Sequence, residues 1–87
     1  MNKNFTVKLK QSPPVEIPIR DDFIRLDAFL KLAGAVESGG QAKQVIQDGR
    51  VRVNGEICTQ RGRKLRVGDV VRYAGQVWSI PQNSDTQ

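Results

Sequence analysis

Residues 49–56 read GRVRVNGE, and this stretch predicts more of the fold than any other part of the chain. A half-buried strand turns its side chains alternately to two faces, so Val51 and Val53 are expected in a core. Arg50 and Arg52 then lie on the opposite face. The Asn-Gly pair that follows is typical of a tight hairpin turn, because both central positions of such a turn need a positive φ. The stretch therefore predicts a strand that presents arginines on a rigid backbone.

A first helix is predicted over residues 23–33, FIRLDAFLKLA, because its apolar side chains recur at helical spacing. Phe23 is assigned to the core side of this helix together with the leucines that follow. Asp27 and Lys31, one turn apart on the solvent side, form an acid-then-base pair that favours a helix. Gly34 is well placed just after the helix end, where a left-handed residue often closes the last turn.

A second helix is predicted to begin at Ser38 and to end at Gly49. Ser38 and Gln41 have the spacing of a capping box, in which two side chains satisfy backbone N–H groups that lack helical partners. Gly39 and Gly40 occupy the first turn, although glycine is a poor helix former. Either a tight connection between the helices excludes side chains there, or bare N–H groups bind an anion such as phosphate. The buried stripe of this helix is predicted to be Ala42, Val45 and Ile46.

Short strands are predicted in the rest of the chain. Residues 56–59 return from the Asn-Gly turn, and residues 60–64 form a basic loop or irregular strand. Residues 70–73 and 76–80 make a final hairpin. The order of strands, helix, helix and further antiparallel strands predicts an α+β fold, in which two helices pack on one face of a small, mostly antiparallel sheet.

The chain is short enough for a single domain, which we assign to residues 23–80. Residues 1–22 are expected to form an N-terminal strand extension, since residues 5–9 and 15–19 alternate apolar and polar side chains. A proline in the second of these stretches cannot donate a ladder hydrogen bond, so this stretch belongs at a sheet edge. The polar residues 81–87 are expected to be a disordered tail.

The formal charge of the 87 residues is +5, and its location is informative. Residues 41–66 hold seven basic and two acidic side chains, whereas the rest of the chain is balanced. A basic excess confined to one stretch of a small domain indicates a polyanionic partner such as nucleic acid. A solvated, solubilising surface is the alternative interpretation.

Several function classes are excluded or disfavoured by composition. The chain has no histidine, so the single cysteine, Cys58, has neither a histidine base for catalysis nor histidine partners for zinc. No nucleotide-binding glycine loop is present, and we expect no enzyme activity, metal or cofactor. No apolar run is long enough to span a membrane, and residues 1–10 lack the apolar core of a signal peptide, so we expect a cytoplasmic protein.

Polar side chains of the second helix, Lys43 and Gln44 among them, run directly into the strand that carries Arg50 and Arg52. The helix face and the strand face are therefore expected to form one continuous basic surface. Arginine favours phosphate because its planar fork donates two parallel hydrogen bonds. The aromatic side chains, including Trp78 and Tyr73, are expected to serve packing, so recognition of RNA shape through phosphates is favoured over base stacking.

The stretches RLDAFLKLAG, SGGQAKQVIQDGRVRVNGE, RGRKL and GDVV together resemble the RNA-binding domain named after small-subunit ribosomal protein S-four, also called the alpha-L motif. The resemblance covers residues 25 to about 71 and is most similar to stand-alone bacterial proteins of the YbcJ type. It implies binding of structured RNA through the two helices and the following strand. Many family members attach this domain to a catalytic partner, but nothing in this sequence resembles such a partner, so the resemblance implies no enzymatic role. The positions it implies for RNA binding are Arg25, Lys31, Gln41, Lys43, Gln44, Arg50, Arg52, Asn54, Arg61, Arg63 and Lys64.

The sequence therefore predicts a non-catalytic, monomeric RNA-binding module whose partner is structured RNA, ribosomal or transfer RNA. One alternative is a protein-interaction module, in which Phe5, Val7, Tyr73 and Trp78 near the sheet edge contact a partner and the basic patch meets an acidic protein. A second alternative is binding of duplex DNA, which shares the same electrostatics.

Overall fold

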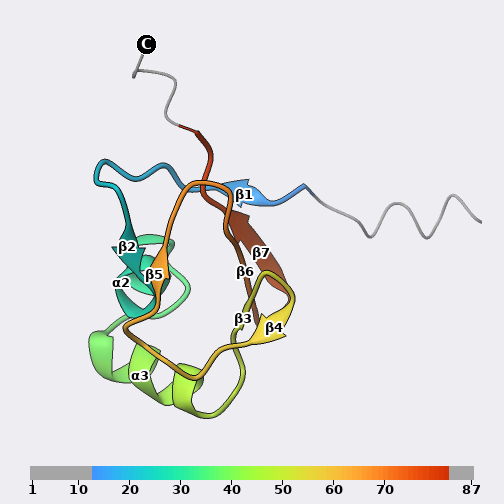
Figure 1. Ribbon diagram of the computed structural model, residues 1–87. Helices are drawn as coiled ribbons and strands as arrows, with labels where there is room; N and C mark the ends of the chain where they lie inside the picture. The colour runs from blue at the N-terminus through green and yellow to red at the C-terminus, as the bar shows by residue number, and fades with distance from the viewer. Residues whose placement is uncertain (1–12, 83–87) are drawn as a thin grey trace, which may run out of the picture.

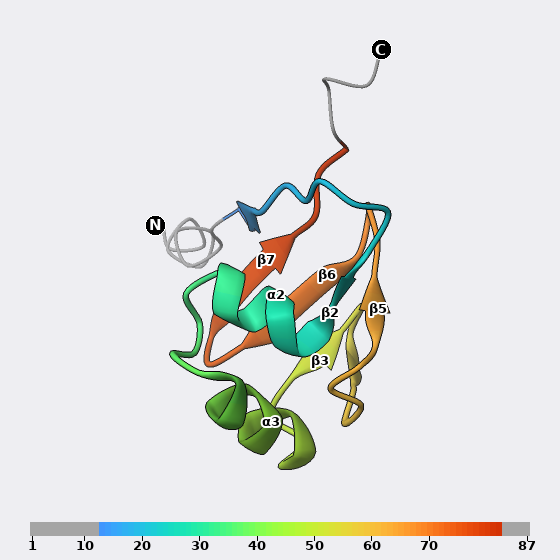
Figure 2. The same ribbon diagram turned by 90° about the vertical axis from the view of Figure 1, so that its left-hand side faces the viewer.

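The computed structural model describes residues 13–82, which form two short helices, a five-stranded sheet and a two-stranded sheet (Figures 1 and 2). The strand expected over residues 5–9 and residues 83–87 of the expected tail lie outside this range. In residues 13–82, neither helix is long and apolar enough to cross a membrane. The elements are β1 (Val15–Glu16), β2 (Ile24–Arg25), α2 (Leu26–Leu32), α3 (Gly39–Gln47), β3 (Arg52–Val53), β4 (Glu56–Ile57), β5 (Lys64–Leu65), β6 (Val70–Tyr73) and β7 (Gln76–Ser79).

The larger sheet has the strand order β1-β7-β6-β3-β4, and the smaller sheet pairs β2 with β5. All pairs are antiparallel except that of β1 with β7, which is parallel. β1 lies at a sheet edge, as its nearby proline predicts. The predicted α+β fold, with two helices on a mostly antiparallel sheet, is confirmed.

Both helices contribute to one hydrophobic core against the inner face of the larger sheet (Figure 2). The predicted alternation of the opening stretch is confirmed, because Val51 and Val53 are buried while Arg50 and Arg52 are exposed. Trp78 is only 6% exposed and packs in this core, as expected. The other core residues are Leu26, Phe29, Leu30, Val36, Ala42, Val45, Ile46, Cys58, Leu65, Val71 and Ile80.

The first helix is shorter than predicted. Its helical residues run from Leu26 to Leu32, and the two residues before it, Ile24 and Arg25, form strand β2 instead. Pairing with Lys64 and Leu65 of β5 holds them extended. At the other end, Gly34 has φ +76° and closes the helix as expected.

The predicted cap of the second helix is present with one change. The Ser38 hydroxyl accepts a hydrogen bond from the Gln41 backbone N–H at 3.1 Å. The Gln41 side-chain oxygen accepts from the Glu37 N–H at 2.8 Å, one residue before the position that a standard capping box uses. Gly49, at φ +77°, ends the helix and turns the chain into β3.

The predicted Asn-Gly turn joins β3 to β4, with φ +53° at Asn54 and φ +89° at Gly55. The Asn54 side chain fixes this turn to a second one. Its amide oxygen accepts from the Val70 N–H at 2.9 Å, and its amide nitrogen donates to the Asp69 carboxylate at 3.0 Å. Asn54 therefore ties the β3–β4 hairpin to the start of β6.

Candidate nucleic-acid interface

The segment that carries the most concentrated positive charge, residues 61–66, is held against the start of α2. We call it the basic segment. A helix start leaves backbone N–H groups without partners. Here the Leu26 N–H donates to the Arg63 carbonyl at 2.8 Å, and the Asp27 N–H donates to the Arg61 carbonyl at 3.1 Å. The backbone of the basic segment thus accepts hydrogen bonds from two N–H groups at the start of α2. Its charged side chains are exposed, whereas Leu65 is buried in the core.

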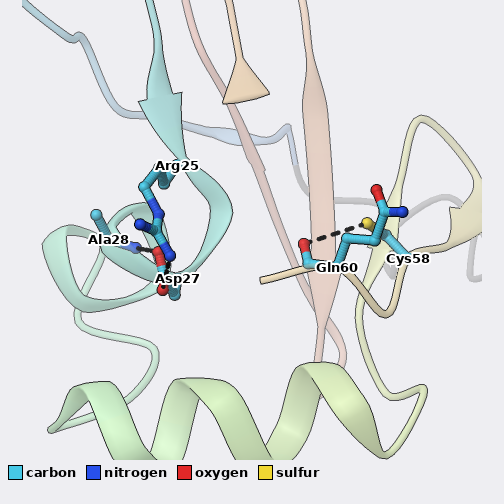
Figure 3. Close-up of polar contacts among 5 residues, drawn as sticks. All are labelled: Arg25, Asp27, Ala28, Cys58 and Gln60. Atoms are coloured by element: carbon cyan, nitrogen blue, oxygen red, sulfur yellow. Dashed lines mark hydrogen bonds and ion pairs between the residues drawn. The ribbon is translucent and has the colours of Figure 1, made fainter. Parts of the chain in front are cut away.

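Cys58 anchors the chain just before the basic segment. It is buried, and its Sγ lies 3.7 Å from the Gln60 carbonyl oxygen (Figure 3). Its N–H donates to the Val51 carbonyl at 2.9 Å, which ties it to the stretch that leads into β3. The cysteine therefore has a packing role.

Arg25 joins the basic segment through strand pairing, since it lies opposite Lys64 in the β2–β5 register. Its guanidinium also approaches Gly62, where an added Cβ would come within 3.7 Å of Nη2. Asp27 accepts from Arg25 Nη2 at 3.0 Å, the one ion pair within residues 13–82 (Figure 3). The predicted pairing of Asp27 with Lys31 is wrong, because the aspartate turns back toward β2.

Lys31 lies near the start of α3 rather than in an ion pair. A shallow pocket of about 270 Å³ is lined by Arg25, Asp27, Ala28, Lys31 and Gly39. This pocket brings two predicted site residues, Arg25 of β2 and Lys31 of α2, close to Gly39 at the start of α3.

The two glycines of α3 have open space around them. A Cβ added at Gly39 would meet no atom within 4 Å, and one added at Gly40 would meet only the Ser38 hydroxyl at 3.9 Å. Crowding between the helices therefore does not explain these glycines, and the first of the two interpretations made from the sequence is wrong. A start of a helix without side chains lets another molecule approach the backbone closely.

The interpretation of Phe23 as part of a helix core is wrong. Phe23 precedes β2 and is 37% exposed. Two cations of the basic segment lie over its ring, with Lys64 Nζ at 4.9 Å and Arg66 Cζ at 5.8 Å from the centroid. Such cation–π contacts restrain the two long side chains. Arg66 was not among the predicted site residues.

The predicted residues of α3 differ in how free their side chains are. Lys43 is exposed. The Gln41 side chain is part of the helix cap, and the Gln44 amide donates to the Asp48 carboxylate at 3.0 and 3.2 Å. The two glutamines therefore already hold groups of their own helix, whereas the lysine is available to a ligand.

Arg52 points away from the helices. Because its neighbours in β3 face the core, its own side chain lies on the outer face of the larger sheet, where it is opposite Arg72 of β6. Arg50, two residues earlier, is exposed where α3 leads into β3. The structure thus brings Arg25, Arg61, Arg63 and Lys64 together. It places Arg52 in a second location with Arg72, a partner that the sequence analysis missed.

Arg66 belongs to the basic stretch counted from the sequence, but its contact with the Phe23 ring joins segments distant in the sequence. Arg72 was missed because it joins Arg52 only through strand pairing. Alternation along β6 was the one available signal, since it predicts that Arg72 is exposed.

Comparison with known proteins places this geometry in a family. The model of the S4 domain family matches residues 17–80. RlbA of Bacillus subtilis (strain 168), named as a probable ribosome maturation protein, is 49% identical over 59 residues, which cover 68% of this chain and 83% of RlbA. The YbcJ protein of Escherichia coli (strain K12) is 42% identical over 52 residues, which cover 60% of this chain and 74% of YbcJ.

The solution structure of YbcJ from E. coli, described as revealing an alfaL motif involved in RNA binding, has the same arrangement of elements. It superposes with a TM-score of 0.63 at 32% sequence identity, over 82% of this chain and 91% of YbcJ. The chain belongs to the S4 domain family and has the alpha-L fold.

Proposed function

We propose that this chain is a non-catalytic RNA-binding protein that recognises structured RNA, ribosomal or transfer RNA, through the exposed cations around α2, α3 and β3. The observation that carries the proposal is the attachment of the basic segment to the start of α2. It brings Arg61, Arg63 and Lys64 next to Arg25 on a fixed backbone. Preorganised donors lose little conformational entropy when they bind a phosphate chain.

The relatives favour this proposal. The S4 domain is an RNA-binding domain, YbcJ carries a motif described as involved in RNA binding, and the name of RlbA refers to ribosome maturation. We favour ribosomal RNA as the partner because the name of RlbA refers to ribosome maturation. A cytoplasmic location and a monomeric state complete the proposal. Residues 23–80 would form the RNA-binding domain, and residues 1–22 its extension.

The proposed contacts fall into two kinds. Lys31, Lys43 and Arg50 have no ion pair in the described chain, so their charges are available to phosphates. Gln41, Gln44 and Asn54 use their side chains in internal hydrogen bonds, and we assign them the role of shaping the helix start, the helix face and the turn that the RNA meets. The open glycines at the start of α3, beside Lys31, offer backbone N–H groups to a further phosphate.

Salt dependence of RNA binding tests the proposal. If about five phosphates are contacted, log affinity falls with log salt with a slope of about −3.5 to −4.5. Raising salt from ~50 to ~200 mM then weakens binding by about two orders of magnitude. Replacing Arg50 and Arg52 together by alanine is expected to flatten the slope and leave the fold intact. A folded double variant with unchanged RNA affinity would remove these two residues from the interface.

The alternative function, a protein-interaction module, is less well supported because two of its four proposed contact residues are buried or half-buried. Trp78 is buried and Tyr73 is half-buried, so neither offers a free aromatic surface. Phe5 and Val7 lie outside the described residues. Affinity purification from cells with and without ribonuclease separates the two functions, since partners that persist after nuclease treatment favour a protein partner. Competition of RNA with duplex DNA tests the remaining alternative.

A further inference from the structure

The outer face of the five-stranded sheet carries two arginines directly opposite each other. Arg52 of β3 is the register partner of Arg72 of β6, and both side chains are exposed. Cβ atoms of directly opposite residues are about 4.5–5.5 Å apart, and like charges at this spacing destabilise a sheet. Folding therefore concentrates positive charge at one place on this face.

Within the described residues, no acidic side chain neutralises the positive charge of Arg52 and Arg72. Neither arginine has a carboxylate within 4.0 Å in residues 13–82. Glu56 of β4 is the register partner of Val53, whose side chain is on the core side, so this glutamate leaves the strand on the side opposite Arg52. Glu16 does lie on the outer face, but at its far edge, opposite Ser79.

The space between the arginines is shaped for a small group. A concave region of about 450 Å³ is lined by Arg52, Arg72, Gly55, Val70 and Val77. Arg52 Nη1 donates to the Gly55 carbonyl at 3.1 Å, which restrains this guanidinium at the side of the hollow. Gly55 itself has no atom within 4 Å of the position of a Cβ, so a ligand can approach the turn closely.

We propose that Arg52 and Arg72 together bind one phosphate group of the RNA backbone on the outer face of the sheet. This inference rests on the proposed function and extends it. RNA is favoured over an acidic peptide because Arg50, exposed where α3 leads into β3, adds a third cation two residues before Arg52. Guanidinium groups also match a phosphate with paired hydrogen bonds.

Inorganic phosphate tests the site without RNA. In wild-type protein, sodium phosphate is expected to raise the melting temperature above that in sodium chloride of equal ionic strength. Arg72→Gln is expected to abolish most of this difference, because one guanidinium alone holds phosphate weakly. Arg20→Gln, which removes an equal charge from an exposed site between β1 and β2, is the matched control and should keep it.

RNA binding tests the shared phosphate. The probe is a transcript of small-subunit ribosomal RNA, with mixed transfer RNA as the second probe. Arg72→Ala is expected to lower affinity about five- to tenfold at ~50 mM salt and to reduce the salt slope by about 1. Because both arginines hold one group, the Arg52→Ala and Arg72→Ala double variant should bind only slightly worse than either single variant. Arg20→Ala should change affinity less than twofold.

The possible outcomes distinguish failure of the proposed function from failure of the shared phosphate site. Failure of wild-type protein to bind either RNA would overturn the proposed function and this inference with it. Tight, salt-dependent RNA binding that Arg72→Ala leaves unchanged would overturn the inference alone. Additive losses in the double variant would contradict a shared phosphate, and loss of the phosphate effect without loss of RNA affinity would make the hollow a site for free phosphate instead.

Discussion

The basic segment and the arginine pair of the sheet gather positive charge by different means. The basic segment is positioned by backbone hydrogen bonds to α2, and its neighbour Arg25 is partly neutralised by Asp27. The pair of Arg52 and Arg72 is positioned by strand register, and no carboxylate of the described chain lies against it. At the basic segment, part of the positive charge is already neutralised within the fold. At the pair of Arg52 and Arg72, the full positive charge remains available to a ligand.

Reversing the charge of the basic segment is expected to have the largest effect on RNA affinity. Arg61→Glu, Arg63→Glu and Lys64→Glu together should lower RNA affinity by about a hundredfold or more at ~100 mM salt, because three attractive contacts become repulsive. The side chains are exposed, so far-ultraviolet circular dichroism should be unchanged. Filter binding or fluorescence anisotropy measures the affinity. A loss smaller than that of Arg72→Ala would place the main contact on the sheet face.

Substitution of Asn54 tests how much the hydrogen bonds between the β3–β4 turn and the start of β6 stabilise the fold. Asn54→Ala removes both amide hydrogen bonds and leaves a residue at φ +53°, which only a few side chains tolerate. We expect a decrease of about 2 kcal/mol in the free energy of unfolding, measured by urea denaturation. Gln76→Ala, which loses one weak 3.4 Å contact, serves as the control. A decrease equal to that of the control would show that the tie to β6 is dispensable.

Substitution of the two glycines at the start of α3 is expected to change stability and RNA affinity in opposite directions. Gly39→Ala with Gly40→Ala should stabilise the fold by about 1 kcal/mol, because alanine costs less backbone entropy and meets no clash here. The same change should weaken RNA binding severalfold if phosphate approaches these N–H groups. Thermal unfolding and RNA titration of one preparation give both numbers. Higher stability with unchanged affinity would exclude an RNA contact at the helix start.

Asp27 provides the smallest and most specific test. Asp27→Asn frees Arg25 and removes a negative charge beside the basic segment, so RNA affinity should rise about threefold at low salt. Arg25 is half-exposed in this ion pair and Asp27 is 17% exposed, so stability should fall by about 1 kcal/mol. Isothermal titration at two salt concentrations follows the change. Weaker RNA binding would mean that Arg25 needs the aspartate to hold its orientation.

The features that could be predicted from the sequence are local ones. Alternation predicted that Val51 and Val53 are buried, the Asn-Gly pair predicted the turn, and Ser38 predicted the start of the second helix. Each depends on residues within a few positions of one another. These patterns were sufficient for the fold class and for the exposure of most predicted site residues.

The features that were missed depend on pairing across the fold. Phe23 was assigned to a helix because nothing near it in sequence indicates that the next two residues pair with Lys64 and Leu65. Arg72 was not considered because its position beside Arg52 follows only from the β3–β6 register. The continuous surface expected from α3 to Arg52 likewise required knowing which face of the sheet the helices cover.

The most direct test is a titration of ¹⁵N-labelled protein with a fragment of small-subunit ribosomal RNA, followed by backbone amide resonances. We expect the largest changes at residues 61–66, at the start of α3 and at Arg52 and Arg72, with little change at β1. Changes confined to β1 and the segment before β2, with the basic segment unaffected, would contradict an RNA interface built on these cations.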